Sequence, residues 1–163
     1  MVAKDYKDHL GRYTVSLPES TIEAMLKWCK EANEMETGGI LLGRYSADLK
    51  RAEISRALGP PSDSLRGQNW FIRGIKGLNR LLRRLWTLRK DYYLGEWHYH
   101  PNASPIPSNV DMSQLETIAR SDKYSCPEPI LIIIGGDPQG RWKMSVTVFP
   151  RDGELTVLNE RSV

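Results

Sequence analysis

The most informative stretch of the chain reads Trp97-His98-Tyr99-His100-Pro101-Asn102-Ala103-Ser104-Pro105-Ile106-Pro107-Ser108-Asn109-Val110-Asp111. Two of the chain's three histidines, His98 and His100, stand here one residue apart. The residues from Tyr92 to His100 predict a strand, and the prolines that follow predict a loop. Because alternate side chains of a strand share a face, His98 and His100 are expected to point toward the same ion.

A helix is predicted to follow this loop, from Ser108 to about Ser121. Ser108 and Asp111 have the spacing of a capping box, in which Ser108 is the N-cap and Asp111 answers it three residues later. Asp111 then lies in the first turn, where its carboxylate can face back toward the strand. Capping and metal binding are compatible roles, because a helix start fixes the rotamer of a ligand.

Two imidazoles and one carboxylate form a donor set that suits zinc. Such a set leaves the fourth tetrahedral position for water, which is typical of a catalytic zinc rather than a structural one. Each part has a simpler interpretation: His-x-His fits a surface or core strand, and Ser-x-x-Asp fits an ordinary helix cap. The combination of the two motifs across a seven-residue loop favours a metal site.

A general base is also expected near this metal. Glu31, Glu34 and Glu36 lie at the end of an earlier predicted helix. Their residue type and position leave the three equal as candidates, and they also fit three solvated carboxylates at a helix end.

The rest of the chain alternates between predicted helices and strands. A first helix begins at Pro18-Glu19-Ser20 and stops before Thr37-Gly38-Gly39, because glycine weakens helix. A second helix is predicted over about Lys76–Lys90. The remaining strands are expected at Tyr13–Leu17, Ile40–Tyr45, Ala52–Leu58, Asn69–Arg73, Ile130–Gly135, Trp142–Pro150 and Glu154–Leu158. This order predicts one α/β domain over residues 1–163, with a central mixed β-sheet flanked by about three α-helices.

Composition narrows the class of protein. The chain has 163 residues, 40% hydrophobic and 26% charged, which is typical of one globular domain. No apolar run approaches the roughly 20 residues that span a bilayer, and the first residues lack the apolar stretch of a signal peptide. Cys29 and Cys126 lie far apart, as expected of buried thiols in a reducing cytoplasm. We therefore expect a cytoplasmic protein that does not interact with membranes.

One segment is strongly basic. Seven basic residues lie from Arg73 to Lys90, with no acid until Asp91. A solvated helix face is the simplest interpretation, and an acidic protein partner is another. Nucleic acid is disfavoured, because Trp86 is the single aromatic residue here that offers base stacking and the net charge is only +3.

The motifs resemble those of the JAMM (JAB/MPN) metallopeptidases. The pattern His-x-His, seven residues, Ser, two residues, Asp matches this family at every defining position. The family also has a glutamate before a glycine-containing strand, and Glu36-Thr37-Gly38-Gly39-Ile40-Leu41-Leu42-Gly43 is similar to that element. This resemblance, which covers nearly the whole chain, is what selects Glu36 among the three glutamates. It implies a JAB/MPN-like fold.

The resemblance also implies roles for these residues. His98, His100 and Asp111 would bind Zn²⁺. Glu36 would take a proton from the attacking water and deliver it to the leaving amine, and Ser108 would donate a hydrogen bond to the developing oxyanion. In this family the reaction is hydrolysis of an amide, often the isopeptide after a ubiquitin-like C-terminal tail.

Gly95-Glu96-Trp97-His98-Tyr99-His100-Pro101-Asn102 and the chain length look similar to a bacterial stand-alone branch of the family. Members of that branch act in CBASS anti-phage operons, beside ubiquitin-transfer-like enzymes, and release a cGAS-like nucleotidyltransferase from its conjugates. An alternative substrate is another ubiquitin-like or sulfur-carrier protein. A non-catalytic MPN scaffold is a further alternative, although scaffolds characteristically lose ligands that are present here.

A substrate tail commonly adds as a strand to a sheet edge. Trp70-Phe71 and the loop Gly59–Gly67 are candidates for such an edge, although Trp70 fits a core position better. The sequence does not identify the substrate protein.

Overall fold

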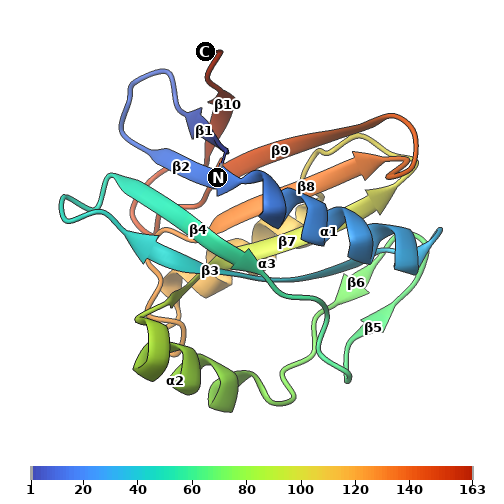
Figure 1. Ribbon diagram of the computed structural model, residues 1–163, viewed down its shortest axis with the longest axis horizontal. Coiled ribbons are helices and arrows are strands. Elements are labelled where there is room, and N and C mark those ends of the chain that lie inside the picture. Colours follow the sequence, from blue (N-terminus) through green and yellow to red (C-terminus); the bar gives the residue numbers. More distant parts are fainter. Residues whose placement is uncertain (1, 163) are drawn as a thin grey trace.

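The computed structural model describes residues 2–162 and is built on a closed, mixed β-sheet (Figure 1). The strands in sheet order are β1 (Ala3–Lys7), β10 (Thr156–Glu160), β9 (Trp142–Val148), β8 (Ile130–Gly136), β7 (Tyr92–Pro101), β3 (Thr37–Tyr45), β4 (Arg51–Ala57) and β2 (Thr14–Pro18). Two neighbouring pairs, β7–β8 and β2–β4, are parallel, and the others are antiparallel. The predicted mixed sheet is confirmed, and its closure through β1 was not predicted.

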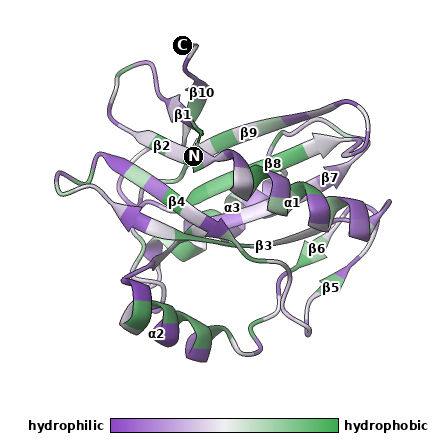
Figure 2. Cartoon of the chain, in the orientation of Figure 1, coloured by the Kyte–Doolittle hydropathy of each residue, from purple (hydrophilic) through white to green (hydrophobic). Residues whose placement is uncertain are grey.

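Within residues 2–162 three helices cover this sheet, as expected: α1 (Glu19–Ala32), α2 (Leu78–Arg89) and α3 (Asn109–Arg120). Both faces of β8 are buried, because its side chains alternate between two apolar clusters. Ile130, Ile132 and Ile134 join the large core that contains residues of α1, whereas Leu131 and Ile133 pack with Leu115 of α3. A strand with two covered faces is continuously apolar, and Figure 2 shows this on β8.

α2 packs on the outer side of β3 and β7. Leu85 is its one fully buried residue, and it contacts a cluster that includes Leu42 and Tyr93. Leu88, in the last turn of the helix, is exposed. The helix is therefore held by a narrow apolar face, and its other faces meet solvent. No helix within the described residues is long and apolar enough to cross a membrane.

A β-bulge sets the direction of the side chains on β7. Leu41 pairs with Gly95 and Leu42 with Tyr93, so Leu94 is an extra residue in the strand. Gly95 has φ +150°, and a Cβ there would lie 1.9 Å from the Ile130 carbonyl oxygen. The bulge lets Leu94 and Trp97 share the core face despite their odd spacing, and it turns the even-numbered residues from Glu96 onward to the opposite face.

Two sequence expectations differ from the structure near the ends of elements. The strand expected at Ile40 begins at Thr37, directly after the α1 turn, because Gly38 and its neighbours pair with β7. The strand expected at Asn69–Arg73 is reduced to β6 (Phe71–Ile72), which pairs with β5 (Leu65–Arg66). Trp70 is 47% exposed, so the expectation that it is a core residue is wrong.

Candidate metal centre

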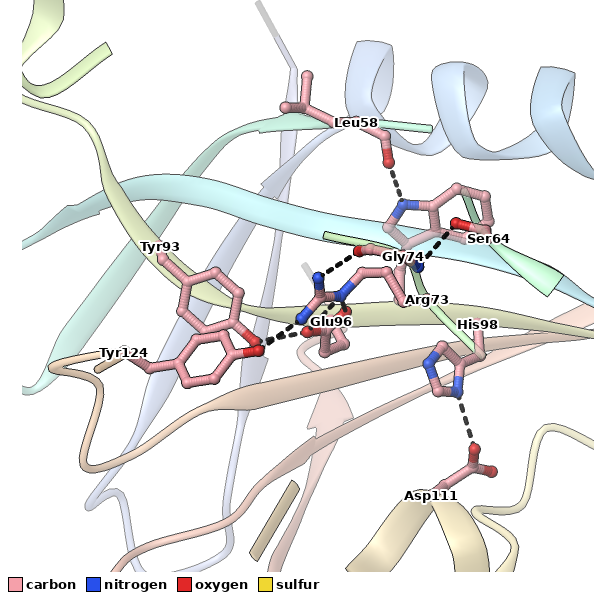
Figure 3. A network of polar contacts seen from close by, with 10 residues as sticks. Leu58, Ser64, Arg73, Gly74, Tyr93, Glu96, His98, Asp111 and Tyr124 are labelled. Carbon is pink, nitrogen blue, oxygen red and sulfur yellow. Dashed lines mark hydrogen bonds and ion pairs between the residues drawn. The ribbon is translucent and has the colours of Figure 1, made fainter. Parts of the chain in front are cut away.

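The three residues predicted as ligands form one buried cluster. Nδ1 of His98 lies 2.8 Å from Oδ1 of Asp111, and Nε2 of His100 lies 3.3 Å from Oδ2 of the same carboxylate. The three side chains place one ligand atom each within 4.8 Å of one another. Figure 3 shows the His98 ring on β7 facing Asp111 at the start of α3.

His98 is held in place by its neighbours on β3 and β6. The ring of Phe71 packs edge-on against the imidazole, with centroids 5.6 Å apart. Gly38 lies opposite His98 in the β3–β7 ladder, and a Cβ there would come within 2.8 Å of His98 Cδ2. The first glycine of the Glu36–Gly43 motif, Gly38, is therefore required sterically, because it leaves room for the His98 imidazole.

Asp111 is oriented by the capping box that the sequence predicted. The Asp111 backbone N–H donates to Ser108 Oγ at 3.1 Å, and the Ser108 backbone N–H donates to Asp111 Oδ2 at 2.8 Å. The helix start thus fixes the carboxylate that faces His98 and His100. Ser108 itself is exposed, so its hydroxyl hydrogen can donate toward the solvent side of the cluster.

The electrostatics of the cluster favour an ionised carboxylate. Burial alone raises the pKa of Asp111, but hydrogen bonds from His100 and His98 outweigh burial and hold the pKa well below its usual range. Burial lowers the pKa of His100, whereas its hydrogen bond to Asp111 and the charges of Asp111 and Glu36 raise the pKa above its ordinary value. The carboxylate is the negative centre to which both imidazoles are drawn.

Glu36 lies at the edge of this cluster, just before β3. Thr37 pairs with Tyr99, so the same register places Glu36 beside His100. Its backbone N–H donates to the Gly67 carbonyl at 2.8 Å, which ties it to the β5–β6 hairpin. Burial raises the pKa of Glu36, with an opposing effect of His100 and a further upward effect of Asp111. Glu31 and Glu34 are exposed, so Glu36 is the carboxylate that the fold brings to the cluster.

A buried ion pair beside the cluster was missed at the sequence level. Arg73 Nε donates to Glu96 at 2.8 Å, and the side chains are only 3% and 0% exposed. Tyr93 also donates to Glu96, and Arg73 donates to the Tyr124 hydroxyl (Figure 3). Arg73 is therefore buried, and the prediction that counted it with the basic residues of a solvated helix face is wrong for this residue. In the sequence, the feature that could have indicated a buried partner is Glu96, a charged residue that shares the face of His98 and His100 in an otherwise apolar strand.

A shallow groove leads away from the cluster between β6 and α3. Its volume is about 610 Å³, and it is lined by Phe71 and Ile72 on one side, by Val110 and Ile118 on the other, and by Tyr124 at its far end. Phe71 is the residue that packs on His98, so the groove starts beside the cluster. We refer to it as the β6–α3 groove.

The cluster fits a divalent metal ion. Its donor set is two imidazoles and one ionised carboxylate, and in tetrahedral zinc sites ligand atoms at about 2.0–2.1 Å from the ion stand roughly 3.3 Å apart. Here one ligand atom from each of the three side chains lies within 4.8 Å of the others, a range that includes this spacing. Nε2 of His98 is buried without a hydrogen-bond partner among the described residues, so the protein alone does not satisfy this imidazole.

Comparisons with known proteins identify the family of the chain. The family model for prokaryotic homologues of the JAB domain matches residues 18–147. A CD-NTase/cGAS isopeptidase from Enterobacter hormaechei is 47% identical over 139 residues, which cover 85% of this chain and 77% of that protein. A probable metalloprotease, y4qB, from Sinorhizobium fredii is 36% identical over 126 residues, which cover 76% of each chain.

The fold also occurs in a solved structure. The solution structure of a protein from Desulfitobacterium hafniense superposes with a TM-score of 0.55 at 20% identity, and the match covers 88% of this chain and 86% of that one. At this identity the likeness concerns the fold alone. The matched family model and the two similar sequences define the class, and the chain belongs to the prokaryotic branch of the JAB-domain (JAMM/MPN) family as a JAMM-type metallopeptidase.

Proposed function

We propose that this metallopeptidase uses Zn²⁺ to hydrolyse the amide bond after the C-terminal tail of a conjugated protein, and that this protein is a cGAS-like nucleotidyltransferase. The relative from Enterobacter hormaechei, named a CD-NTase/cGAS isopeptidase, supports the substrate class. The reaction then reverses conjugation by ubiquitin-transfer-like enzymes in the cytoplasm, as in a CBASS anti-phage pathway.

The observation that carries the chemistry is the buried His98, His100 and Asp111 cluster with Glu36 at its edge. In the proposal His98, His100 and Asp111 hold the zinc. When bound, zinc supplies a Lewis acid that makes water nucleophilic near neutral pH and polarises the carbonyl of the scissile bond.

Glu36 is the proposed general base and acid. Its carboxylate removes a proton from the attacking water and later delivers it to the leaving amine. The raised pKa of Glu36, caused by burial, suits this role. A carboxylate with a higher pKa is a stronger base toward the water proton, and more of it is protonated near neutral pH for delivery to the leaving amine. Acid–base catalysis of this kind contributes roughly 10²–10⁴-fold.

Ser108 is the proposed oxyanion donor. Its Oγ accepts a hydrogen bond from the Asp111 backbone N–H, which fixes the oxygen and leaves the hydroxyl hydrogen free to donate. The capping geometry therefore positions the donor without extra structure. A donor placed in advance stabilises the negative charge that develops on the carbonyl oxygen.

The substrate tail is proposed to lie along β6, in the β6–α3 groove. β6 pairs with β5 on one side, and its residue Ile72 is exposed. An extended tail that adds to this edge would gain backbone hydrogen bonds and place alternate side chains in the groove. Trp70, next to β6 and exposed, is positioned to contact such a tail.

A paired measurement tests the proposal. Wild type and Glu36→Ala are assayed for zinc content and for cleavage of a reporter fused after the C-terminal residues of a cGAS-like nucleotidyltransferase. We expect about one zinc per chain in both proteins and cleavage by wild type alone. Zinc without cleavage would contradict the nucleotidyltransferase as substrate and direct the search to other ubiquitin-like or sulfur-carrier tails.

A further inference from the structure

The outer face of α2 carries a concentrated positive charge that the metal centre does not use. Six cations lie on α2 and its two ends, and all six are exposed: Lys76, Arg80, Arg83, Arg84, Arg89 and Lys90. We call this set the α2 basic surface. Its charge exceeds the net charge of +3 of the whole chain, so the rest of the chain is net negative.

This charge is little offset among the described residues, where Lys76 helps to lower the pKa of the nearby Asp63 carboxyl. None of the six cations forms an ion pair with another residue in the range 2–162. Arg80, Arg83 and Arg84 stand three and four positions apart on the side of the helix away from Leu85. Like charges at this spacing repel one another and destabilise the helix, so these arginines do not contribute to the stability of α2.

Apolar and aromatic side chains adjoin the α2 basic surface. Trp86, Leu88 and Tyr92 are 42%, 67% and 47% exposed. The rings of Trp86 and Tyr92 pack with their centroids 4.7 Å apart, and Lys90 Nζ lies 4.7 Å from the Trp86 centroid. Exposed aromatic and arginine side chains together are typical of protein–protein interfaces. Tyr92 and Lys90 already pack against the Trp86 ring, so stacking of a nucleic-acid base on this ring is disfavoured.

The helix that carries the α2 basic surface packs, through its opposite face, close to residues that line the proposed tail groove. Ile118 and Tyr124 line the β6–α3 groove, and both belong to the apolar cluster on which Leu85 of α2 packs. From Tyr92, which contacts Trp86, six residues of β7 lead to His98, a span of about 20 Å at roughly 3.3 Å per residue. A tail cut at the metal centre can therefore be joined to a folded domain that rests on α2.

From this charge, these aromatics and this position we infer that the α2 basic surface docks an acidic face of the folded domain whose C-terminal tail is cleaved. This inference rests on the proposed function. Complementary charge brings the substrate to the enzyme faster and orients it, whereas the groove and the metal centre act on the tail alone.

The test compares two substrates and two charge-reversed variants. One substrate is a complete cGAS-like nucleotidyltransferase fused through its C-terminus to a fluorescent protein, and the other is its last residues alone fused to the same reporter. The first variant, Arg80→Glu/Arg83→Glu/Arg84→Glu, reverses three charges of the α2 basic surface and is called the α2 variant. The control, Lys27→Glu/Lys30→Glu/Lys50→Glu, makes the same charge change at exposed positions away from α2.

We expect the α2 variant to lose about tenfold or more in kcat/KM on the complete fusion and to keep wild-type activity on the tail fusion. The control is expected to resemble wild type on both substrates, and added salt should narrow the gap between wild type and the α2 variant. Three glutamates repel one another as three arginines do, so the Tm of the α2 variant is expected to stay close to that of wild type.

Three outcomes would overturn the inference. Equal cleavage of the complete fusion by wild type and the α2 variant would show that α2 does not dock the substrate. Binding of a labelled random oligonucleotide that the α2 variant loses, with cleavage of the complete fusion unchanged, would assign the surface to nucleic acid. Failure of wild type to cut even the tail fusion would instead refute the proposed function on which the inference rests.

Discussion

At the scale of single residues, the start of α3 has two roles: it caps the helix and it orients the Asp111 carboxylate. Asp111 completes a capping box with Ser108 and also faces His98 and His100. The cap satisfies backbone N–H groups that would otherwise be unpaired. It also holds the Asp111 carboxylate and the Ser108 hydroxyl in fixed positions. The same hydrogen bonds therefore stabilise α3 and prepare the proposed chemistry.

Glu36→Gln is predicted to reduce kcat by about 10²–10⁴-fold while zinc content stays near that of wild type. The pKa of Glu36 is raised above its ordinary value of 4.5, so the folded protein binds this proton more tightly than the unfolded chain. Ionised Glu36 therefore does not stabilise the fold at neutral pH, and the Tm of Glu36→Gln should not fall.

The pH profile of wild type checks the same carboxylate. The base must be ionised to act, so kcat/KM is expected to decline as the pH falls through the raised pKa, above the 4.5 of an ordinary glutamate. Zinc content is measured at each pH as the control. A wild-type acid limb that persists unchanged in the residual activity of Glu36→Gln would contradict the assignment.

Two substitutions at Ser108 separate capping from catalysis. Ser108→Ala is predicted to destabilise the protein by about 1 kcal/mol, whereas Ser108→Gly should cost only a few tenths, because glycine is a tolerated N-cap. Both remove the proposed oxyanion donor, so kcat should fall by about 10²–10³-fold in each. Activity of Ser108→Gly close to wild type, measured beside its urea denaturation curve, would limit Ser108 to capping.

At the scale of elements, β7 depends on its bulge. Leu94 is the extra residue, and the strand beyond it directs His98 and His100 away from the core that contains Trp97. The carbonyl of Ile130 on β8 approaches Gly95 too closely for any side chain. The position of His98 and His100 thus depends on Gly95, which precedes them in the strand.

Gly95→Ala is predicted to destabilise the protein by about 3 kcal/mol or more, because it combines a strained φ of +150° with a Cβ 1.9 Å from a carbonyl oxygen. Gly153→Ala is the matched control: φ is not in the left-handed region and the nearest atom lies at 3.4 Å. Urea denaturation should show the control within about 0.5 kcal/mol of wild type. A Gly95→Ala protein as stable as the control would rule out the strained bulge.

The Arg73–Glu96 pair links β6 to β7 beside the metal centre. Arg73→Met leaves Glu96 as a buried charge without its partner and is predicted to cost about 3–5 kcal/mol in the free energy of unfolding. The double variant Arg73→Met/Glu96→Leu removes both charges and should recover much of that loss. If the double variant were less stable than Arg73→Met, the pair would not be the source of the penalty.

At the scale of the whole molecule, local patterns predicted much of the fold. The three helices and most strands follow from periodicity, caps and glycines, with boundaries shifted by a few residues. The structure also brings together Glu36, His98, His100 and Asp111, which lie far apart in sequence or across a loop. Residue type and spacing alone did not separate Glu36 from Glu31 and Glu34, because that choice depends on tertiary position.

Other features depend on long-range pairing and were not predicted. β1 is short and rich in polar residues, and it forms because β2 and β10 flank it, which closes the sheet. The Arg73–Glu96 pair needs β6 and β7 to meet before its charges can be buried. Trp70 was misjudged because an exposed aromatic and a core aromatic look alike in sequence.

The central claim is that His98, His100 and Asp111 hold the catalytic metal, and zinc content tests it most directly. Wild type and the nearly isosteric Asp111→Asn are equilibrated with zinc, dialysed and measured by mass spectrometry, with folding checked by circular dichroism. We predict about one zinc per chain in wild type and far less in Asp111→Asn. No zinc in wild type, or full zinc in Asp111→Asn, would contradict the claim.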